Sequence, residues 1–232
     1  VTTIHIETPG GLVRCDVEVD GGRVGAVAFT NVESFVLHDG ANVHVEGLGE
    51  LTIDVVYGGD FYAYVDGDAI GLDLGPHNDA EMIALANRII PAVAAQLEIA
   101  HPLRPDINRC YQTFYYSSKT TTGDYRQTVV APPGAIDRSP CGTGTSSRVA
   151  LLHTRGEIGL GEARRFEGPI GTCFTGEAVS AETRDGITYV RPKVSGRAWI
   201  TGFHQFVVDP EDPVPTGFRV GPPPREVPRP SR

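Results

Sequence analysis

The amino-acid sequence predicts an α+β fold, and three observations support that prediction. Most of the elements that can be recognised are short strand-like runs, and in residues 12–19 apolar and polar residues alternate, the pattern of a half-buried strand. Turns rich in glycine, proline and aspartate separate these runs. Only two stretches have the spacing and end signals of helices, and no internal repeat is visible. A chain of mostly strands with two main helices is typical of the α+β class.

Three strands are expected at the start of the chain, at residues 3–7, 12–19 and 24–32. Glycine-rich turns at 9–11 and 20–22 separate them. In the second strand Cys15 shares a face with three valines. We therefore interpret Cys15 as a small core side chain, because free cysteine is commonly buried.

The middle of the chain begins with a polar connection at 38–50, followed by a strand pair at 51–57 and 61–65. A long helix is predicted from Asn78 or Asp79 to Ala100, with an Asx cap at its start. Pro91 lies inside it and predicts a kink or a break. One face of this helix carries an apolar stripe that indicates core packing, formed by Met82, Leu85, Ala86, Ile89, Val93 and Leu97.

Further strands are expected on both sides of the second helix. They are predicted at residues 108–117, 125–130, 168–179, 187–192 and 198–208. Cys110 and Cys173 lie within these runs and are interpreted as packing residues. The proline-rich end, residues 214–232, predicts an extended or disordered tail.

A reactive side chain, flexible backbone and a helix start coincide in one stretch. It reads Asp137-Arg138-Ser139-Pro140-Cys141-Gly142-Thr143-Gly144-Thr145-Ser146-Ser147-Arg148. We expect a helix from Thr145 to Arg155, closed by Gly156. The positive end of the helix dipole favours a thiolate, so the pKa of Cys141 is predicted to fall below its free value of about 8.5. The same backbone N–H groups can hold a carboxylate.

This stretch resembles the second catalytic motif of the proline racemase family, which includes proline racemases and 4-hydroxyproline epimerases. The resemblance covers nearly the whole chain apart from the last dozen residues. Downstream it includes Arg155-Gly156-Glu157, Gly161-Glu162, Phe174-Thr175-Gly176, Gly196-Arg197-Ala198-Trp199 and Asp209-Pro210. Upstream it includes Tyr57-Gly58-Gly59-Asp60-Phe61-Tyr62-Ala63 and His101-Pro102.

The resemblance implies a fold of two lobes, each a curved sheet around a central helix, as in diaminopimelate epimerase-like proteins. By that likeness residues 1–45 are the remaining part of the first lobe, residues 46–196 are the second lobe, and residues 197–232 return to the first lobe and end in the tail. The family's Met-Cys-Gly-His motif supplies the other catalytic cysteine and a histidine, but no such motif occurs here. The first lobe is therefore expected to be incomplete.

The family's activity is racemisation or epimerisation at the α-carbon of proline or 4-hydroxyproline, without a cofactor. Inverting a carbon needs a base on one face and an acid on the other, and the family uses two cysteines. The resemblance assigns one of these roles to Cys141. The N–H groups of Gly142 and Thr143 would bind the substrate carboxylate, and Asp137 would accept hydrogen bonds from the substrate ammonium. Family members are commonly homodimers.

Composition argues against several other partners. The net charge of −9 argues against sequence-independent nucleic-acid binding. No stretch approaches the roughly 20 apolar residues of a membrane-spanning helix. The four cysteines lack the paired spacing of metal ligands, so no metal site is expected. We interpret them as reduced thiols of a cytoplasmic protein.

Simpler interpretations of the same residues stay open. Asp137 before Ser-Pro is also typical of a turn cap, and Cys141 could be an inert buried thiol. A cysteine hydrolase would need a histidine base, but His153 lies about 18 Å away along the predicted helix, which leaves His101 and His204. A truncated family member that keeps one lobe and binds amino acids weakly is the main alternative function.

Overall fold

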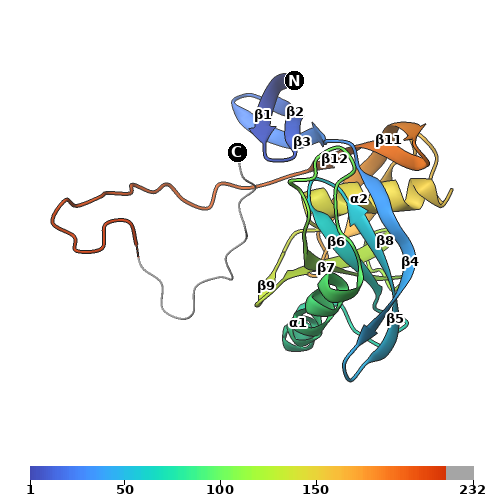
Figure 1. Cartoon of the computed structure of the whole chain (residues 1–232). Coiled ribbons are helices and arrows are strands. Elements are labelled where there is room, and N and C mark those ends of the chain that lie inside the picture. Colours follow the sequence, from blue (N-terminus) through green and yellow to red (C-terminus); the bar gives the residue numbers. More distant parts are fainter. Residues whose placement is uncertain (218–232) are drawn as a thin grey trace. The chain divides into compact units, whose positions relative to one another are not determined.

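A single β-sheet contains all the strands of the structure. The computed structural model describes residues 1–217. The chain divides into two compact units, Val1–Arg197 and a second that begins at Ala198. Every helix and strand of the described residues belongs to the first unit (Figure 1).

Short turns connect most of the strands. The strands are β1 (Thr2–Thr8), β2 (Gly11–Asp20), β3 (Arg23–Thr30), β4 (Phe35–Val45), β5 (Gly49–Tyr57), β6 (Phe61–Asp66), β7 (Cys110–Ser117), β8 (Tyr125–Ala131), β9 (Ala135–Ile136), β10 (Arg164–Glu167), β11 (Cys173–Arg184) and β12 (Ile187–Gly196). Two α-helices, α1 (Asp79–Gln96) and α2 (Gly142–Thr154), and the short 3-10 helix η1 (Pro76–Asn78) complete the unit. The two α-helices lie in the longer intervals between β6 and β7 and between β9 and β10. The predicted α+β class is confirmed.

The order of the strands in the sheet is β1-β2-β3-β12-β11-β10-β8-β7-β6-β5-β4, and β9 pairs with β8. Most neighbours are antiparallel, whereas β6–β7 and β8–β10 are parallel. The three N-terminal strands form where they were predicted. Gly21 and Gly22 both have positive φ in the turn between β2 and β3, which glycine adopts without strain.

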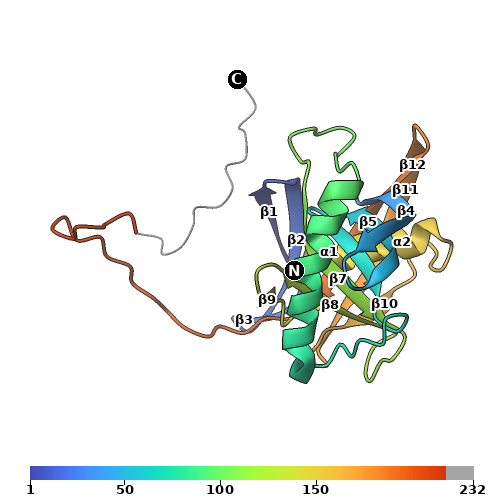
Figure 2. The same ribbon diagram turned by 60° about the horizontal axis from the view of Figure 1, so that its bottom comes forward.

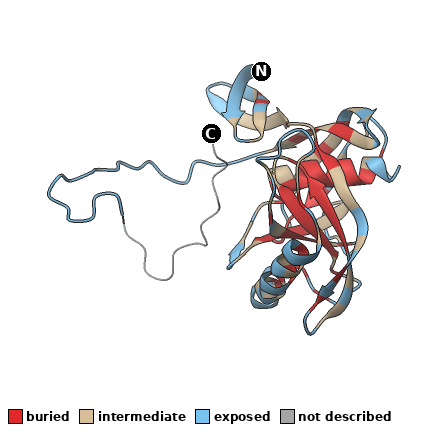
Figure 3. Ribbon diagram, viewed as in Figure 1, coloured by how far each residue is buried: buried red, intermediate tan, exposed pale blue. Residues whose placement is uncertain are grey.

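The sheet curls around α2. Strand β12 and the start of β4 meet through the Ser34–Val190 bridge, in which each backbone N–H donates to the other's carbonyl at 2.7 and 2.8 Å. All residues from Gly144 to Leu152 of α2 are buried, and the helix is red in Figure 3. The curved sheet around a central helix, expected from the resemblance, is confirmed. This arrangement places the start of α2, and with it Cys141, among residues of several strands.

Helix α1 covers the opposite face of the sheet, and Figure 2 shows it in front of the strands. Successive side chains of β6 point to opposite faces of the sheet. Phe61 packs in the core beneath α1, whereas Tyr62 packs with Cys141 on the α2 side. The buried stripe of α1 consists of Met82, Ala86, Ile89 and Val93, as its spacing predicts.

The ends of α1 differ from the prediction. The helix continues past the exposed Pro91 to Gln96 and stops before the predicted end at Ala100. Asn78 provides no side-chain cap; its amide instead donates to Glu81 and to the carbonyl of Asp73. None of the helices in the described part of the chain is long and apolar enough to cross a membrane.

Three predicted boundaries are wrong. The polar connection at 38–50 is largely strand β4, whose register shifts near His38 interrupt the alternation that would have revealed it. The run 168–179 begins as a strand only at Cys173, and the separate strand β10 before it was not predicted. The expected strand at 198–208 is absent from the described residues, where His204 is exposed.

The predicted extended or disordered tail, residues 214–232, falls mostly outside the described residues. Residues 214–217 contain no helix or strand, and residues 218–232 lie outside the described residues. The division into lobes at residues 45 and 197 stays a prediction.

Candidate active site

Cys141 begins the buried helix α2. It is the N-cap residue: its carbonyl accepts from Thr145 N–H at 2.8 Å, and its sulfur accepts from Gly144 N–H at 3.3 Å. Its φ of 64° lies in a region that L-residues rarely adopt, at a cost of about 1–3 kcal/mol. The contacts around Cys141 must therefore hold this conformation. Helix α2 starts at Gly142, three residues before the predicted Thr145, which places Cys141 at the helix start itself.

Hydrogen bonds fix the turn that precedes Cys141. Ser139 Oγ accepts from Cys141 N–H at 3.0 Å, and Asp137 Oδ1 accepts from both N–H and O–H of Ser139 at 2.8 Å. The fully buried Gln127 on β8 donates to the carbonyl of Pro140 at 2.6 Å. Thr145 O–H donates to the same carbonyl at 3.1 Å. Both the C=O and the N–H of the peptide group that precedes Cys141 are thus anchored.

The loop between β5 and β6 packs closely against the first turns of α2. A Cβ atom at Gly58 would lie 2.3 Å from the Thr143 carbonyl oxygen, so only glycine fits there. The buried Asn31 donates to the Gly58 carbonyl at 2.7 Å and to Ser146 Oγ at 2.9 Å. The glycine pair of this loop therefore permits close approach of two backbones.

The sulfur of Cys141 is buried, and its surroundings contradict the predicted pKa. Burial raises the pKa of the Cys141 thiol, and the negative charge of Asp137 raises it further. Hydrogen bonds from Tyr62, Gly144 and Thr143 oppose this rise without cancelling it. The prediction of a lowered pKa was wrong because it counted the helix start and not the desolvation of the sulfur.

Two backbone donors beside the sulfur remain available to a ligand. Gly142 and Thr143 are the first residues of α2, so their N–H groups have no partner within the helix. No acceptor among residues 1–217 takes either N–H. Both residues are partly exposed, unlike Gly144 and the residues after it. Donors of this kind suit a carboxylate.

Asp137 has a structural role that the sequence already left open. Its Oδ1 accepts both hydrogen bonds from Ser139, which is the turn cap considered as the simpler interpretation. The carboxylate is half-buried and close enough to Cys141 to affect its pKa. Its role as the partner of a substrate ammonium stays a prediction.

The other candidate residues are engaged elsewhere. Cys15 and Cys110 are buried, and the sulfur of Cys110 lies 3.5 Å from the Phe61 carbonyl oxygen. Cys173 lies 3.3 Å from Thr122 Oγ1. His153 contacts the Ile158 carbonyl at 3.0 Å near the far end of α2. Within residues 1–217, no group of three or more His, Cys, Asp and Glu side chains is placed to hold a metal ion.

His101 was one of the two histidines left as a possible base for a cysteine hydrolase. It is half-buried against aromatic rings. Its ring meets those of Phe35 and Tyr57 edge-on, with centroids 4.9 and 4.7 Å apart. Burial lowers the pKa of His101. It follows the end of α1 and forms no hydrogen bond with Cys141 among the described residues, so nothing supports a cysteine–histidine pair.

Sequence reasoning missed four residues whose side chains hydrogen-bond to the motif: Tyr62, Tyr64, Gln127 and Asn31. Only Tyr62 had a signal, because it lies in the stretch at 57–63 that carried the family resemblance. Gln127 and Asn31 both lie within predicted strands, where an isolated amide side chain has no distinguishing pattern.

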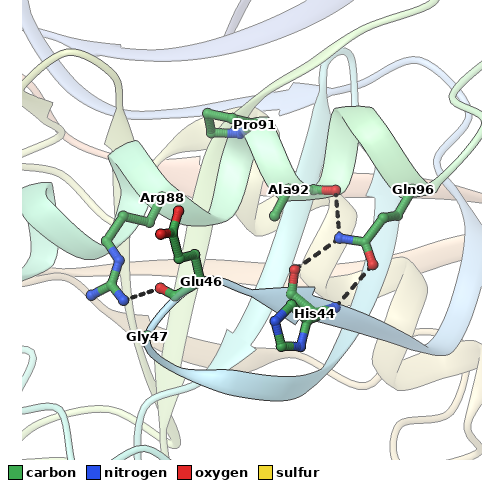
Figure 4. A pocket seen from close by; sticks show the side chains of 7 residues that line it. All are labelled: His44, Glu46, Gly47, Arg88, Pro91, Ala92 and Gln96. Atoms are coloured by element: carbon green, nitrogen blue, oxygen red, sulfur yellow. Dashed lines mark hydrogen bonds between the residues drawn. The ribbon is translucent and has the colours of Figure 1, made fainter.

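A hollow of about 680 Å³ between α1 and β4 is separate from these residues (Figure 4). Gln96 donates to the His44 carbonyl at 2.8 Å and accepts from His44 N–H at 3.0 Å, and Arg88 donates to the Glu46 carbonyl. The Gln96 amide and the Arg88 guanidinium therefore bond to backbone groups of the same hollow, and no cysteine lines it.

Comparisons with known proteins agree on one family. Residues 1–219 match the family model described as proline racemase. The chain is 37% identical over 219 residues to the proline racemase of Clostridioides difficile, which covers 94% of this chain and 65% of that protein. It is 40% identical over 218 residues to the 4-hydroxyproline 2-epimerase of Streptosporangium roseum, covering 94% and 66%.

A solved structure shows the same fold. The crystal structure of a hydroxyproline epimerase from Agrobacterium vitis, with bound trans-4-OH-L-proline, matches with a TM-score of 0.87 and 32% identity. The match covers 94% of this chain and 63% of that one. This chain thus spans about 65% of the length of the relatives it matches.

Proposed function

Because this chain belongs to the proline racemase family, we propose that it serves cofactor-independent racemisation or epimerisation at the α-carbon of proline or 4-hydroxyproline. Cys141 would be one of two cysteines that transfer the α-proton. The observation that supports this role is the position of its sulfur at the start of α2, beside two backbone N–H groups without partners.

The proposed step begins with Cys141 as thiolate. The sulfur takes the α-proton and becomes a thiol, while the electron pair of the C–H bond moves into the substrate carboxylate. The N–H groups of Gly142 and Thr143 would stabilise the charge that develops on the carboxylate oxygens. Asp137 would hold the substrate ammonium, which stays protonated. Inversion is completed when a second acid delivers a proton to the opposite face.

The described residues offer one sulfur for this reaction. All four cysteines lie within residues 1–217, and the hydrogen-bond partners of Cys141 Sγ in that range are Tyr62, Thr143 and Gly144, none of them a cysteine. A single base can remove a proton and return one from solvent to the same face. We therefore expect this chain by itself to exchange the α-proton of the substrate with retention of configuration.

The same observation favours the alternative of a non-catalytic family member that binds amino acids weakly. Such a chain would bind proline at the start of α2 without exchanging its α-proton. Exchange in deuterium oxide separates the two functions, because it requires a base on one face only.

The test follows α-proton loss from L-proline and trans-4-hydroxy-L-proline in deuterium oxide by NMR, together with optical rotation. Exchange that falls at least about 100-fold in Cys141→Ser supports the proposal, because general base catalysis contributes at least that much. Cys173→Ser removes a cysteine that contacts Thr122 and is the matched control, expected to keep the wild-type rate. Equal exchange in Cys141→Ser and the wild type would refute the role of Cys141. Binding without exchange in the wild type would establish the alternative.

A further inference from the structure

Cys141 has a hydroxyl group from another element beside its sulfur. Tyr62 on β6 places its hydroxyl 3.5 Å from Cys141 Sγ and 2.5 Å from Thr143 Oγ1. The residue is only 1% exposed, so water does not compete for this hydroxyl. We propose that Tyr62 is a positioning residue that donates a hydrogen bond to Cys141 whenever the sulfur is a thiolate. The hydrogen bond itself is independent of the proposed function, and only its consequence for catalysis rests on that function.

Tyr62 has one hydroxyl proton and two acceptors. When Cys141 is a thiol, the proton is better placed on Thr143 Oγ1, the nearer neutral acceptor. When Cys141 loses its proton, the thiolate becomes the stronger acceptor, because hydrogen bonds to charged groups are about twice as strong as neutral ones. The hydroxyl thus turns between two partners as the sulfur changes charge.

Tyr62 acts as a hydrogen-bond donor only and keeps its proton throughout. Burial raises the pKa of Tyr62 well above its ordinary value, and the charge of Cys141 adds to that rise. The phenol is therefore neutral in both states of the sulfur. No proton passes from Tyr62 to Cys141 or to a substrate in this proposal.

The groups that face the sulfur define what removal of this hydroxyl would do. From α2, Gly144 N–H donates at 3.3 Å and Thr143 Oγ1 lies at 3.9 Å. From the preceding turn comes the charge of Asp137, and from the strands come Tyr62 and the buried, neutral Tyr64. Tyr62 provides the largest effect that opposes burial. Without its hydroxyl, the pKa of Cys141 is expected to rise further.

The experiment measures how fast iodoacetamide alkylates Cys141 as a function of pH, with the modified cysteine identified by mass spectrometry. Only the thiolate reacts, so the midpoint of the profile reports the pKa of the thiol. Tyr62→Phe is expected to move the midpoint upward and to slow alkylation at mildly alkaline pH by roughly tenfold, since one pKa unit changes the thiolate fraction by that factor. At pH above both midpoints the rates of the two proteins are expected to converge.

Tyr64→Phe is the matched control. Tyr64 lies on the same face of β6, and its hydroxyl contacts Ser147 Oγ at 2.7 Å and the Gly144 carbonyl at 3.3 Å instead of the sulfur. The Tyr64→Phe variant also loses a tyrosine hydroxyl beside α2, but that hydroxyl does not contact the sulfur. We therefore expect the midpoint of its alkylation profile to be unchanged. A general loosening of the structure would expose Cys141 and accelerate its alkylation, which is opposite to the expected effect.

Thr143→Val provides a second variant that does not depend on the folding of Tyr62→Phe. It removes the acceptor that competes for the Tyr62 hydroxyl, and with it the longer contact of Thr143 Oγ1 with the sulfur at 3.9 Å. Because Tyr62 lies nearer to the sulfur, at 3.5 Å, and has the larger effect on its pKa, the midpoint is expected to fall. An unchanged midpoint in Tyr62→Phe, or an equal shift in Tyr64→Phe, would overturn the proposal. If Tyr62→Phe does not fold, an unchanged or raised midpoint in Thr143→Val would do so.

This test and the test of function fail separately. A shifted midpoint in a chain that exchanges no α-proton would support the hydrogen bond and refute the catalytic function. If exchange does occur, Tyr62→Phe is expected to lower it at neutral pH and to recover it at higher pH. A purely structural role would lower exchange at all pH values alike.

Discussion

Cys141 keeps a backbone conformation that is unfavourable by itself, and single residues around it determine whether it can do so. Its φ of 64° is held between Ser139 on one side and Thr145 on the other. Gln127 anchors the intervening Pro140 carbonyl from the sheet. Gly58 completes the enclosure, because its backbone touches the first turn of α2 where no side chain fits.

Gly58→Ala tests this close approach. The new Cβ would lie 2.3 Å from Thr143 O and 2.6 Å from Ser147 N, both backbone atoms that cannot rotate away. We expect the free energy of unfolding to fall by about 1–3 kcal/mol or more, as overpacking does, and the alkylation profile of Cys141 to change. Chemical denaturation measures the first effect.

Gly134→Ala is the control for Gly58→Ala, because a Cβ there would meet only Ile83 at an ordinary 3.7 Å. Its stability is expected to stay within about 0.5 kcal/mol of the wild type, as for an ordinary surface substitution. Equal stability of both variants would show that the loop between β5 and β6 can yield to the added methyl group.

At the scale of the elements, the two edge strands of the sheet differ in whether another element covers them. Strand β1 forms one edge, and its described residues before Thr8 are all exposed. Strand β4 forms the other, and α1 covers it through Gln96 and Arg88 (Figure 4). The Gln96 amide accepts a hydrogen bond from the His44 N–H and donates one to the His44 C=O, as the backbone of a neighbouring strand would. An edge strand with free backbone groups invites pairing with another chain, and this contact removes that option locally.

Gln96→Ala should therefore open the edge of β4. We expect the His44 amide to exchange its hydrogen faster, because its acceptor is lost, and the protein to associate more readily at high concentration. Hydrogen exchange by NMR and light scattering measure the two effects. Unchanged protection of the His44 amide would contradict the assignment.

Asn87→Ala is the control for Gln96→Ala, since Asn87 is an exposed amide on the same helix that donates to the Pro133 carbonyl instead of β4. It is expected to leave His44 unchanged. A loss of His44 protection in both variants would point to a general effect on α1.

At the scale of the whole molecule, burial differs sharply between elements: α2 and the central strand β6 are mostly buried, whereas β1 is exposed (Figure 3). The central helix is buried from Gly144 to Leu152, and the sheet closes around it where Ser34 meets Val190. In the described part of the second unit, Trp199 is 70% exposed and Phe203 and Phe206 are 92% exposed. Regions that bury little apolar surface open at low free-energy cost.

Native-state hydrogen exchange should follow this difference in burial. The slowest amides are expected in α2 and β6, where opening requires global unfolding, and much faster ones in β1. Mass spectrometry of peptic peptides provides the measurement. If peptides of β1 were protected as strongly as those of α2, the edge position of β1 in this chain would be wrong.

The strands at the start of the chain, the buried stripe of α1 and the position of Cys141 at a helix start were all predictable, because each depends on local spacing and turn residues. The resemblance that identified the family depended on the stretch around Cys141 and on the one at 57–63. Strand β4 was not predictable, since its register shifts interrupt the alternation. The predictions of a side-chain cap at Asn78 and of a strand at 198–208 were wrong. A local signal predicts a cap or a strand only if other residues of the fold leave the required hydrogen-bond partners free or supply them.

The sequence by itself determined which atom carries the proposed chemistry and the helix start on which it lies, because Pro140, Cys141 and Gly142 specify that turn through their own backbone preferences. Only the tertiary structure decided the state of that atom. The sheet that curls around α2 removes water from the sulfur and brings Tyr62 and Asp137 beside it, and these contacts between residues distant in the chain set its pKa. Desolvation depends on what surrounds a group in space, and local sequence does not record it.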